Sequence, residues 1–106
     1  MEQEITVQEL KMKQAAGASF LLLDVREPEE VAIAQLPHSV HIPMGEIPGR
    51  LHELDPEKEI VVYCHHGVRS LRVANFLLQR DFAHVKSLAG GIDAWSLEMD
   101  PALPRY

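Results

Sequence analysis

The sequence predicts an α/β domain with a central parallel β-sheet flanked by helices on both faces. Two observations predict this fold class. Residues 20–23 and 60–63 are short, wholly apolar runs, which are typical of strands buried on both faces of a parallel sheet. Segments with helical periodicity alternate with these runs, as they do where helices connect parallel strands.

The first half of the chain carries clear helix signals on either side of its apolar strand. Thr6 and Glu9 have the spacing of a capping box, so we expect a helix that begins there and stops near Gly17. Pro28 suits the first turn of a short helix that follows the strand.

The second half continues the alternation. We expect an extended piece between prolines (36–43), a segment with helical spacing (44–54), a strand (60–63) and a helix with a broad apolar face (71–78). After these we expect a last strand (85–88), a tight turn at Gly90-Gly91, a short helix (92–96) and a tail that lies against the surface (100–106).

Length and composition predict one domain over residues 1–106. The chain is 46% apolar and 25% charged, which is ordinary for a globular protein. Its net charge of −6 argues against nucleic acid or an anionic membrane as a partner. We find no signal peptide and no apolar run near the roughly 18 residues of a membrane span. A single cysteine excludes an intrachain disulfide and indicates a reducing, cytoplasmic compartment.

That cysteine, Cys64, has the most informative setting in the chain. It follows an apolar strand and precedes the turn at residues 65–70, which leads at once into a helix. Unpaired backbone N–H groups and the helix dipole favour an anion at such a position. The pattern therefore predicts a nucleophilic thiolate, whereas a free cysteine without such flanks is more often an inert core residue.

The surroundings of Cys64 are basic although the whole chain is acidic. Arg69, Arg72, His65 and His66 lie within eight residues of it, and no acid lies among them. Because salt screens distant charges beyond about 8–10 Å, a local basic pocket can capture an anion. Arg72 is either an aid to anion capture or a surface residue.

A second set of polar residues ends the other apolar strand. Parallel strands bring their carboxyl ends to one rim, so Asp24 and Arg26 are expected near Cys64. We expect Asp24 to support the neighbouring loop by hydrogen bonding. We expect Arg26 to form a structural ion pair, with Glu30 as a candidate partner.

Four sequence segments together resemble a single-domain rhodanese, a sulfurtransferase fold. They are residues 22–30, 42–43, 62–70 and 88–95, which occur in the order and spacing of that family. One stretch departs from the family pattern, because Gln35 stands where the family usually has a histidine.

The resemblance implies a thiosulfate sulfurtransferase-like enzyme. Such an enzyme takes a sulfane sulfur from thiosulfate or a similar donor, carries it as a persulfide, and passes it to a thiol or to cyanide. Carried onto this sequence, Cys64 is the nucleophile, and the active-site loop consists of His65, His66, Gly67, Val68 and Arg69. Arg69 closes the loop and can hold an anionic donor, because its guanidinium fork matches an oxyanion.

Several alternatives remain open at this point. Four residues separate Cys64 from Arg69; a phosphatase family of the same fold has a loop one residue longer, so the resemblance favours sulfur over phosphate. The chain is alternatively a sulfur-relay or interaction module loaded by a protein persulfide donor. His65 and His66 either tune the thiolate or face solvent. No cofactor is predicted, and no histidine spacing predicts a metal site.

Overall fold

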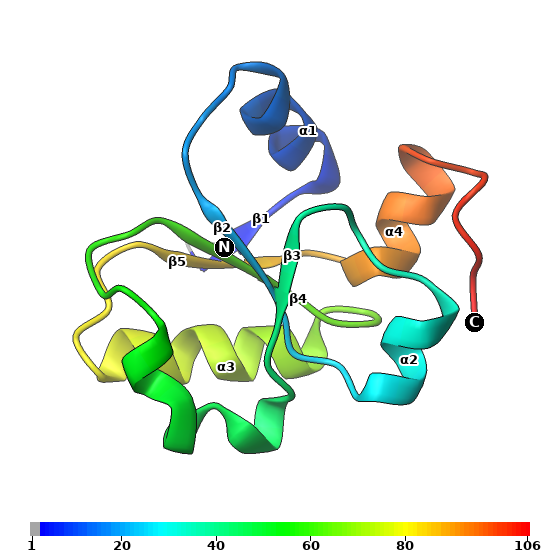
Figure 1. Ribbon diagram of the computed structural model, residues 1–106. Helices are drawn as coiled ribbons and strands as arrows, with labels where there is room; N and C mark the ends of the chain where they lie inside the picture. The colour runs from blue at the N-terminus through cyan, green and yellow to red at the C-terminus, as the bar shows by residue number, and fades with distance from the viewer. Residues whose placement is uncertain (1–2) are drawn as a thin grey trace.

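The computed structural model describes residues 3–106 and contains one five-stranded sheet (Figure 1). All of its strand pairs are parallel, in the order β1-β5-β4-β2-β3. The strands are β1 (Glu4–Ile5), β2 (Leu21–Asp24), β3 (Ser39–His41), β4 (Ile60–Tyr63) and β5 (Val85–Leu88). The predicted fold class is therefore confirmed.

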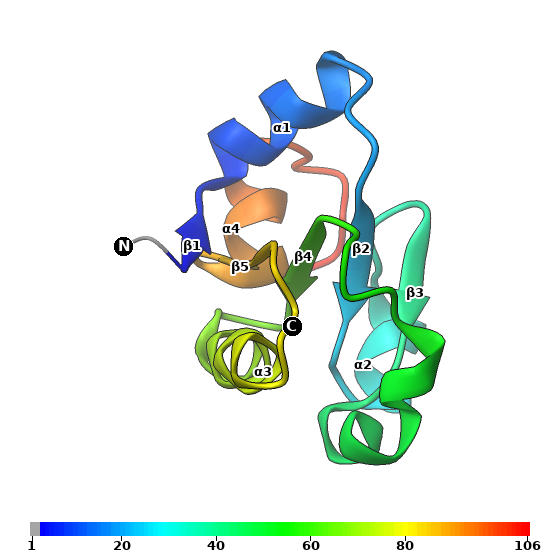
Figure 2. The same ribbon diagram turned by 90° about the vertical axis from the view of Figure 1, so that its left-hand side faces the viewer.

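Helices cover both faces of the sheet. They are α1 (Val7–Ala15), α2 (Pro28–Ile33), α3 (Val68–Gln79) and α4 (Gly91–Glu98), together with two 3₁₀ segments, η1 (Met44–Glu46) and η2 (Pro48–Glu53). Figure 2 shows α1 and α4 on one side of the sheet and α3 on the other. None of the helices formed by residues 3–106 combines the length and apolar character that crossing a bilayer requires.

The sheet separates two apolar cores, because neighbouring residues of a strand point to opposite faces. Leu23 and Val62 join the core beneath α3. Leu22 and Val61, their neighbours in sequence, join the core beneath α1 and α4. This double burial explains why the two strands are apolar runs instead of alternating sequences.

The structure differs from the sequence prediction at two places. The short edge strand β1 was not expected, because two residues carry no periodicity. Residues 44–54 form two 3₁₀ segments instead of one helix, since Pro48 and the glycines beside it disfavour a continuous α-helix. By contrast, the capping box at the start of α1 is confirmed by hydrogen bonds in both directions between Thr6 and Glu9.

The topology brings the expected polar residues to one rim. β4 lies between β5 and β2 in the sheet, and Asp24 is in register with Tyr63, the residue before Cys64. The backbone pairing continues one step further, because the Val25 N–H donates to the Tyr63 carbonyl at 3.2 Å. The carboxyl ends of β2 and β4 therefore lie side by side, as the sequence predicted.

Candidate active site

The Cys64 sulfur lies in a cradle formed by its own loop. Its Sγ accepts hydrogen bonds from the backbone N–H groups of Gly67, at 3.1 Å, and of Ser70, at 3.4 Å. These are N–H groups at the start of α3, which have no partner within the helix. The residue is only 1% exposed. Backbone N–H groups in this position can stabilise negative charge on the Cys64 sulfur.

A chain of hydroxyl groups continues behind the sulfur. The Cys64 thiol donates to the Ser70 Oγ at 3.4 Å, and that oxygen lies 2.7 Å from the Ser87 Oγ. Both serines are fully buried. Sequence reasoning missed them as site residues. The available signal was Ser87, a polar residue of β5 that is buried together with Val85 and Leu88, while Lys86 is exposed.

The loop is fixed from outside by the start of α4. The N–H groups of Ile92 and Asp93 donate to the carbonyls of Cys64, at 2.9 Å, and His65, at 3.2 Å. A Cβ at Gly91 would lie 2.4 Å from the His65 oxygen, and the φ of Gly91 is +62°. Only glycine allows this close approach. Because the loop carbonyls point toward α4, the N–H groups of Gly67 and Ser70 are free to face the sulfur.

Arg69 at the end of the loop is engaged by an acidic residue from α2. Its Nη1 and Nη2 donate to the two carboxylate oxygens of Glu30 at 2.6 and 2.9 Å. The pair is partly exposed, with 29% of the Arg69 and 18% of the Glu30 side chain accessible. The hydrogen bonds from Arg69 lower the pKa of Glu30 to about 2, so its carboxylate is ionised throughout the neutral range.

The expected partner of Arg26 was therefore wrong. Arg26 pairs with Asp24 through its Nε, at 3.0 Å, and its Nη2, at 2.7 Å, and both side chains are buried. It contacts Glu30 only through the backbone carbonyl, at 3.4 Å. Burial opposes the charge of Arg26, but its hydrogen bonds to Asp24 and Tyr106 outweigh burial and raise its pKa. The expected supporting role of Asp24 takes the form of this pair.

Tyr106 joins the two ion pairs. Its hydroxyl accepts from Arg26 Nη1 at 2.9 Å and donates to Glu30 Oε2 at 2.7 Å. Figure 1 shows the end of the chain running down beside α2, where this contact forms. The tail was expected to lie against the surface, but its contact with the candidate site was not, since nothing local in the sequence links residues 76 positions apart.

The two loop histidines stack on each other, and His65 also stacks on Tyr106. The His65 ring lies 3.8 Å from the His66 ring and 3.9 Å from the Tyr106 ring, centroid to centroid. Burial, followed by the charge of His66, lowers the pKa of His65. This lowering of the pKa disfavours the charged form of His65, in which it would act as a cation beside Cys64.

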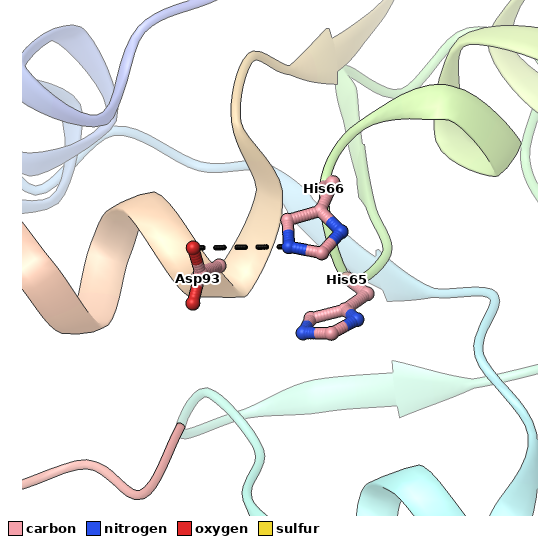
Figure 3. Close-up of side chains that lie close together, drawn as sticks. All are labelled: His65, His66 and Asp93. Carbon is pink, nitrogen blue, oxygen red and sulfur yellow. Dashed lines mark ion pairs between the residues drawn. The ribbon is translucent and has the colours of Figure 1, made fainter. Parts of the chain in front are cut away.

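Figure 3 shows His66 pointing toward Asp93, at 3.8 Å between Nε2 and Oδ2, with the His65 ring beside it. One ligand atom from each of His65, His66 and Asp93 lies within 4.8 Å of the others. The spacing of the histidines had not predicted this donor set. The Asp93 carboxylate is already engaged, because Arg105 donates to it at 2.8 and 3.3 Å.

The remaining predicted residues lie on the exposed side of the site. Val68 is 63% exposed at the start of α3. Arg72 is also exposed and lines an apolar hollow of about 200 Å³ between α3 and the 3₁₀ segments. A larger hollow of about 640 Å³ lies at the amino ends of β4 and β5, and no residue of the Cys64 loop lines it.

Fold and site together define an α/β domain with a buried cysteine at the carboxyl end of a central parallel strand, cradled by the start of the next helix. Comparison with known proteins gives the family. The family model described as Rhodanese-like domain matches residues 6–98. The chain belongs to this family.

Two relatives and one solved structure are similar to this chain over nearly its whole length. The chain is 43% identical over 98 residues to YtwF of Bacillus subtilis, covering 92% of this chain and 94% of that protein. It is 35% identical to a sulfurtransferase of Allochromatium vinosum, over 91% of this chain and 90% of that protein. Its structure resembles that of a rhodanese-like domain protein from Staphylococcus aureus, with a TM-score of 0.83, 32% identity and 98% of each chain covered.

Proposed function

We propose that this protein is a sulfurtransferase that carries a sulfane sulfur as a persulfide on Cys64. The cradle of N–H groups around the Cys64 sulfur is the observation that carries the proposal. Such donors stabilise the thiolate before the reaction and the charged terminal sulfur after it. Membership of a family whose named relatives include a sulfurtransferase supports the same chemistry.

The proposed cycle has two steps. The Cys64 thiolate attacks the outer sulfur of a donor, thiosulfate or a similar compound, and the donor's sulfur–sulfur bond breaks to release sulfite or the corresponding thiolate. A thiophilic acceptor, a thiol or cyanide, then attacks the persulfide and regenerates Cys64. Because Cys64 is the only cysteine, no internal disulfide can release the sulfur. The acceptor must come from outside, which predicts ping-pong kinetics.

Mass spectrometry of the intact protein tests the proposal. After treatment with thiosulfate or glutathione persulfide, the wild-type chain should gain one sulfur that a reductant removes. Cys64→Ser should gain none, while Ser19→Ala, an exposed substitution remote from the loop, should behave as wild type. An equal gain on Cys64→Ser would contradict the assignment.

A second candidate is a sulfur-relay module that receives sulfur from a protein donor and turns over small molecules slowly. Val68, inside the loop itself, is exposed, so a protein donor could contact the loop directly. Rapid loading by a cysteine desulfurase with feeble thiosulfate-to-cyanide turnover would support the relay. Either role requires that Cys64 remain a free thiol between cycles and not become oxidised, so we propose a reducing, cytoplasmic setting.

A further inference from the structure

The cation expected to hold an anionic donor is already bound to a carboxylate. Arg69 and Glu30 meet fork to fork through two parallel hydrogen bonds. This is the edge of a guanidinium that also binds an oxyanion in two-point fashion. An oxyanion donor must therefore displace Glu30 or approach with Glu30 beside it.

Glu30 is held in place by more than Arg69. Its Oε2 accepts from the Tyr106 hydroxyl at 2.7 Å, and its Oε1 accepts from the Glu27 N–H at 3.1 Å. Swinging the carboxylate away would break these contacts as well as the ion pair. The engaged state of Arg69 is thus built into the structure.

Other charges near the loop do not replace the neutralised arginine. Arg26 is paired with Asp24, and Arg105 is paired with Asp93. Among the ion pairs formed by residues 3–106 none involves Arg72, but this residue lies one helical turn beyond Arg69 on an exposed face. A dianionic donor that approaches the loop therefore meets the negative charge of Glu30, while the guanidinium of the loop, Arg69, is already paired. The net charge of the chain, −6, also repels such a donor.

We propose that Glu30 is a specificity-determining residue: by neutralising Arg69, it makes the site favour sulfane sulfur carried on a thiol over oxyanion donors such as thiosulfate. This inference rests on the proposed function of Cys64. It concerns the class of donor, a persulfide R–S–SH, in which the sulfur to be transferred needs no oxyanion-binding cation.

The two loading reactions differ in the charge that the site must hold. With a persulfide, Cys–S⁻ attacks the outer sulfur of R–S–SH, the S–S bond breaks, and Cys–S–SH and R–S⁻ are formed. With thiosulfate, Cys–S⁻ attacks S–SO₃²⁻ and releases SO₃²⁻, leaving Cys–S–S⁻. The second reaction brings a thiolate, a dianion and Glu30 together, and this repulsion raises its barrier relative to the first.

Glu30→Gln tests the inference, because glutamine keeps the shape and can still accept from Arg69 and Glu27 while the negative charge is removed. Glu53→Gln is the matched control: it makes the same charge change in an exposed pair with Arg50 on η2. The kcat/KM of each variant is measured with thiosulfate and with glutathione persulfide, using cyanide as acceptor.

We expect Glu30→Gln to raise kcat/KM for thiosulfate about tenfold, mainly through a lower KM, since one nearby unit charge has an effect of this order. The value for glutathione persulfide should change less than about twofold, and Glu53→Gln should change neither. The double variant Glu30→Gln, Arg69→Gln should lose the gain. Tyr106→Phe, which loosens Glu30 without removing it, should give a smaller rise.

The outcomes separate this inference from the function it rests on. If both donors load Cys64 but Glu30→Gln leaves thiosulfate kcat/KM unchanged, or raises both donors equally, the donor-class inference is wrong and the proposed function stands. If the gain persists in the double variant, Arg69 is not the group that Glu30 masks, which also overturns it. If neither donor places sulfur on Cys64 in any variant, both proposals are wrong.

Discussion

Two arginines of this protein, Arg26 and Arg69, each grip a carboxylate through two hydrogen bonds, but in different surroundings. Arg26 and Asp24 are buried at the end of β2, with side chains 0% and 1% exposed, and Arg26 also donates to the Ala34 carbonyl at 2.7 Å. Arg69 and Glu30 lie at the rim, partly in water, and connect α3 to α2. Tyr106 touches both pairs.

The difference in burial determines how much each pair contributes to the stability of the fold. Removing one partner of a buried pair leaves the other charge unpaired in the interior. Breaking the pair of Arg26 with Asp24 should therefore lower the stability of the fold. Water and salt screen a pair at the rim, so a substitution in the Arg69 pair should cost the fold less. The outer pair, Arg69 with Glu30, is therefore the one that we propose to affect the choice of sulfur donor.

The largest expected loss of stability comes from breaking the inner pair, Arg26 with Asp24. Asp24→Asn should lower the free energy of unfolding by about 3–5 kcal/mol, because it leaves the buried Arg26 guanidinium uncompensated. Urea denaturation measures this. Glu46→Gln, which breaks an exposed pair with Arg50, should cost less than about 1 kcal/mol. Equal losses of stability in Asp24→Asn and Glu46→Gln would mean that burial does not make the Arg26 pair more important to the fold than an exposed pair.

Breaking the outer pair should cost less. Arg69→Gln should destabilise the fold by about 1–2 kcal/mol, since Glu30 keeps its hydrogen bonds from Tyr106 and Glu27 and remains in contact with water. The same denaturation experiment, run beside Asp24→Asn, checks the ranking. A loss as large as that of Asp24→Asn would make Arg69 a structural residue and remove the contrast.

The Tyr106 hydroxyl, which links the two ion pairs, should contribute least to stability among these contacts. Tyr106→Phe removes one hydroxyl but keeps the ring on His65, so we expect a loss of about 1 kcal/mol. A double-mutant cycle of Tyr106→Phe with Glu30→Gln should show coupling. If the two effects simply add, the hydroxyl does not hold Glu30.

Lowering the pH tests the outer pair, Arg69 with Glu30, through its contribution to stability. The pKa of Glu30 is lowered from 4.5 to about 2 in the folded state, so the unfolded chain binds the proton more tightly. The stability that this carboxylate contributes is complete above pH 4.5 and is lost as the pH falls toward 2. Between pH 5 and 3, wild type should lose stability faster than Glu30→Gln in thermal melts. Parallel curves would show that Glu30 has no such shift.

The sequence allowed the sheet and the sulfur cradle to be predicted because both depend on local patterns. The apolar runs at β2 and β4 indicate buried strands, and the cysteine followed by Gly67 and a helix indicates where the N–H groups lie. The roles of Arg69, His65 and His66 in the reaction remain predictions. The predicted partner of Arg26 was wrong: Arg26 pairs with Asp24, two residues before it, whereas Glu30 pairs with Arg69 from another helix.

Contacts between distant segments could not be predicted in this way. Glu30 reaches Arg69 from α2, and Tyr106 reaches Glu30 and Arg26 from the end of the chain. Their meeting depends on where α2 and the tail pack, which no short motif encodes. The hydroxyl pair of Ser70 and Ser87 is similar, since it joins α3 to β5 across the core.

A single-turnover experiment tests most directly whether Cys64 carries sulfur between donor and acceptor. Wild-type protein is loaded with sulfur, freed of donor and mixed with cyanide. We predict that the added sulfur leaves Cys64 and that about one equivalent of thiocyanate forms per loaded protein. An adduct that persists in the presence of cyanide, with no thiocyanate formed, would show that the persulfide is not an intermediate and would contradict the account.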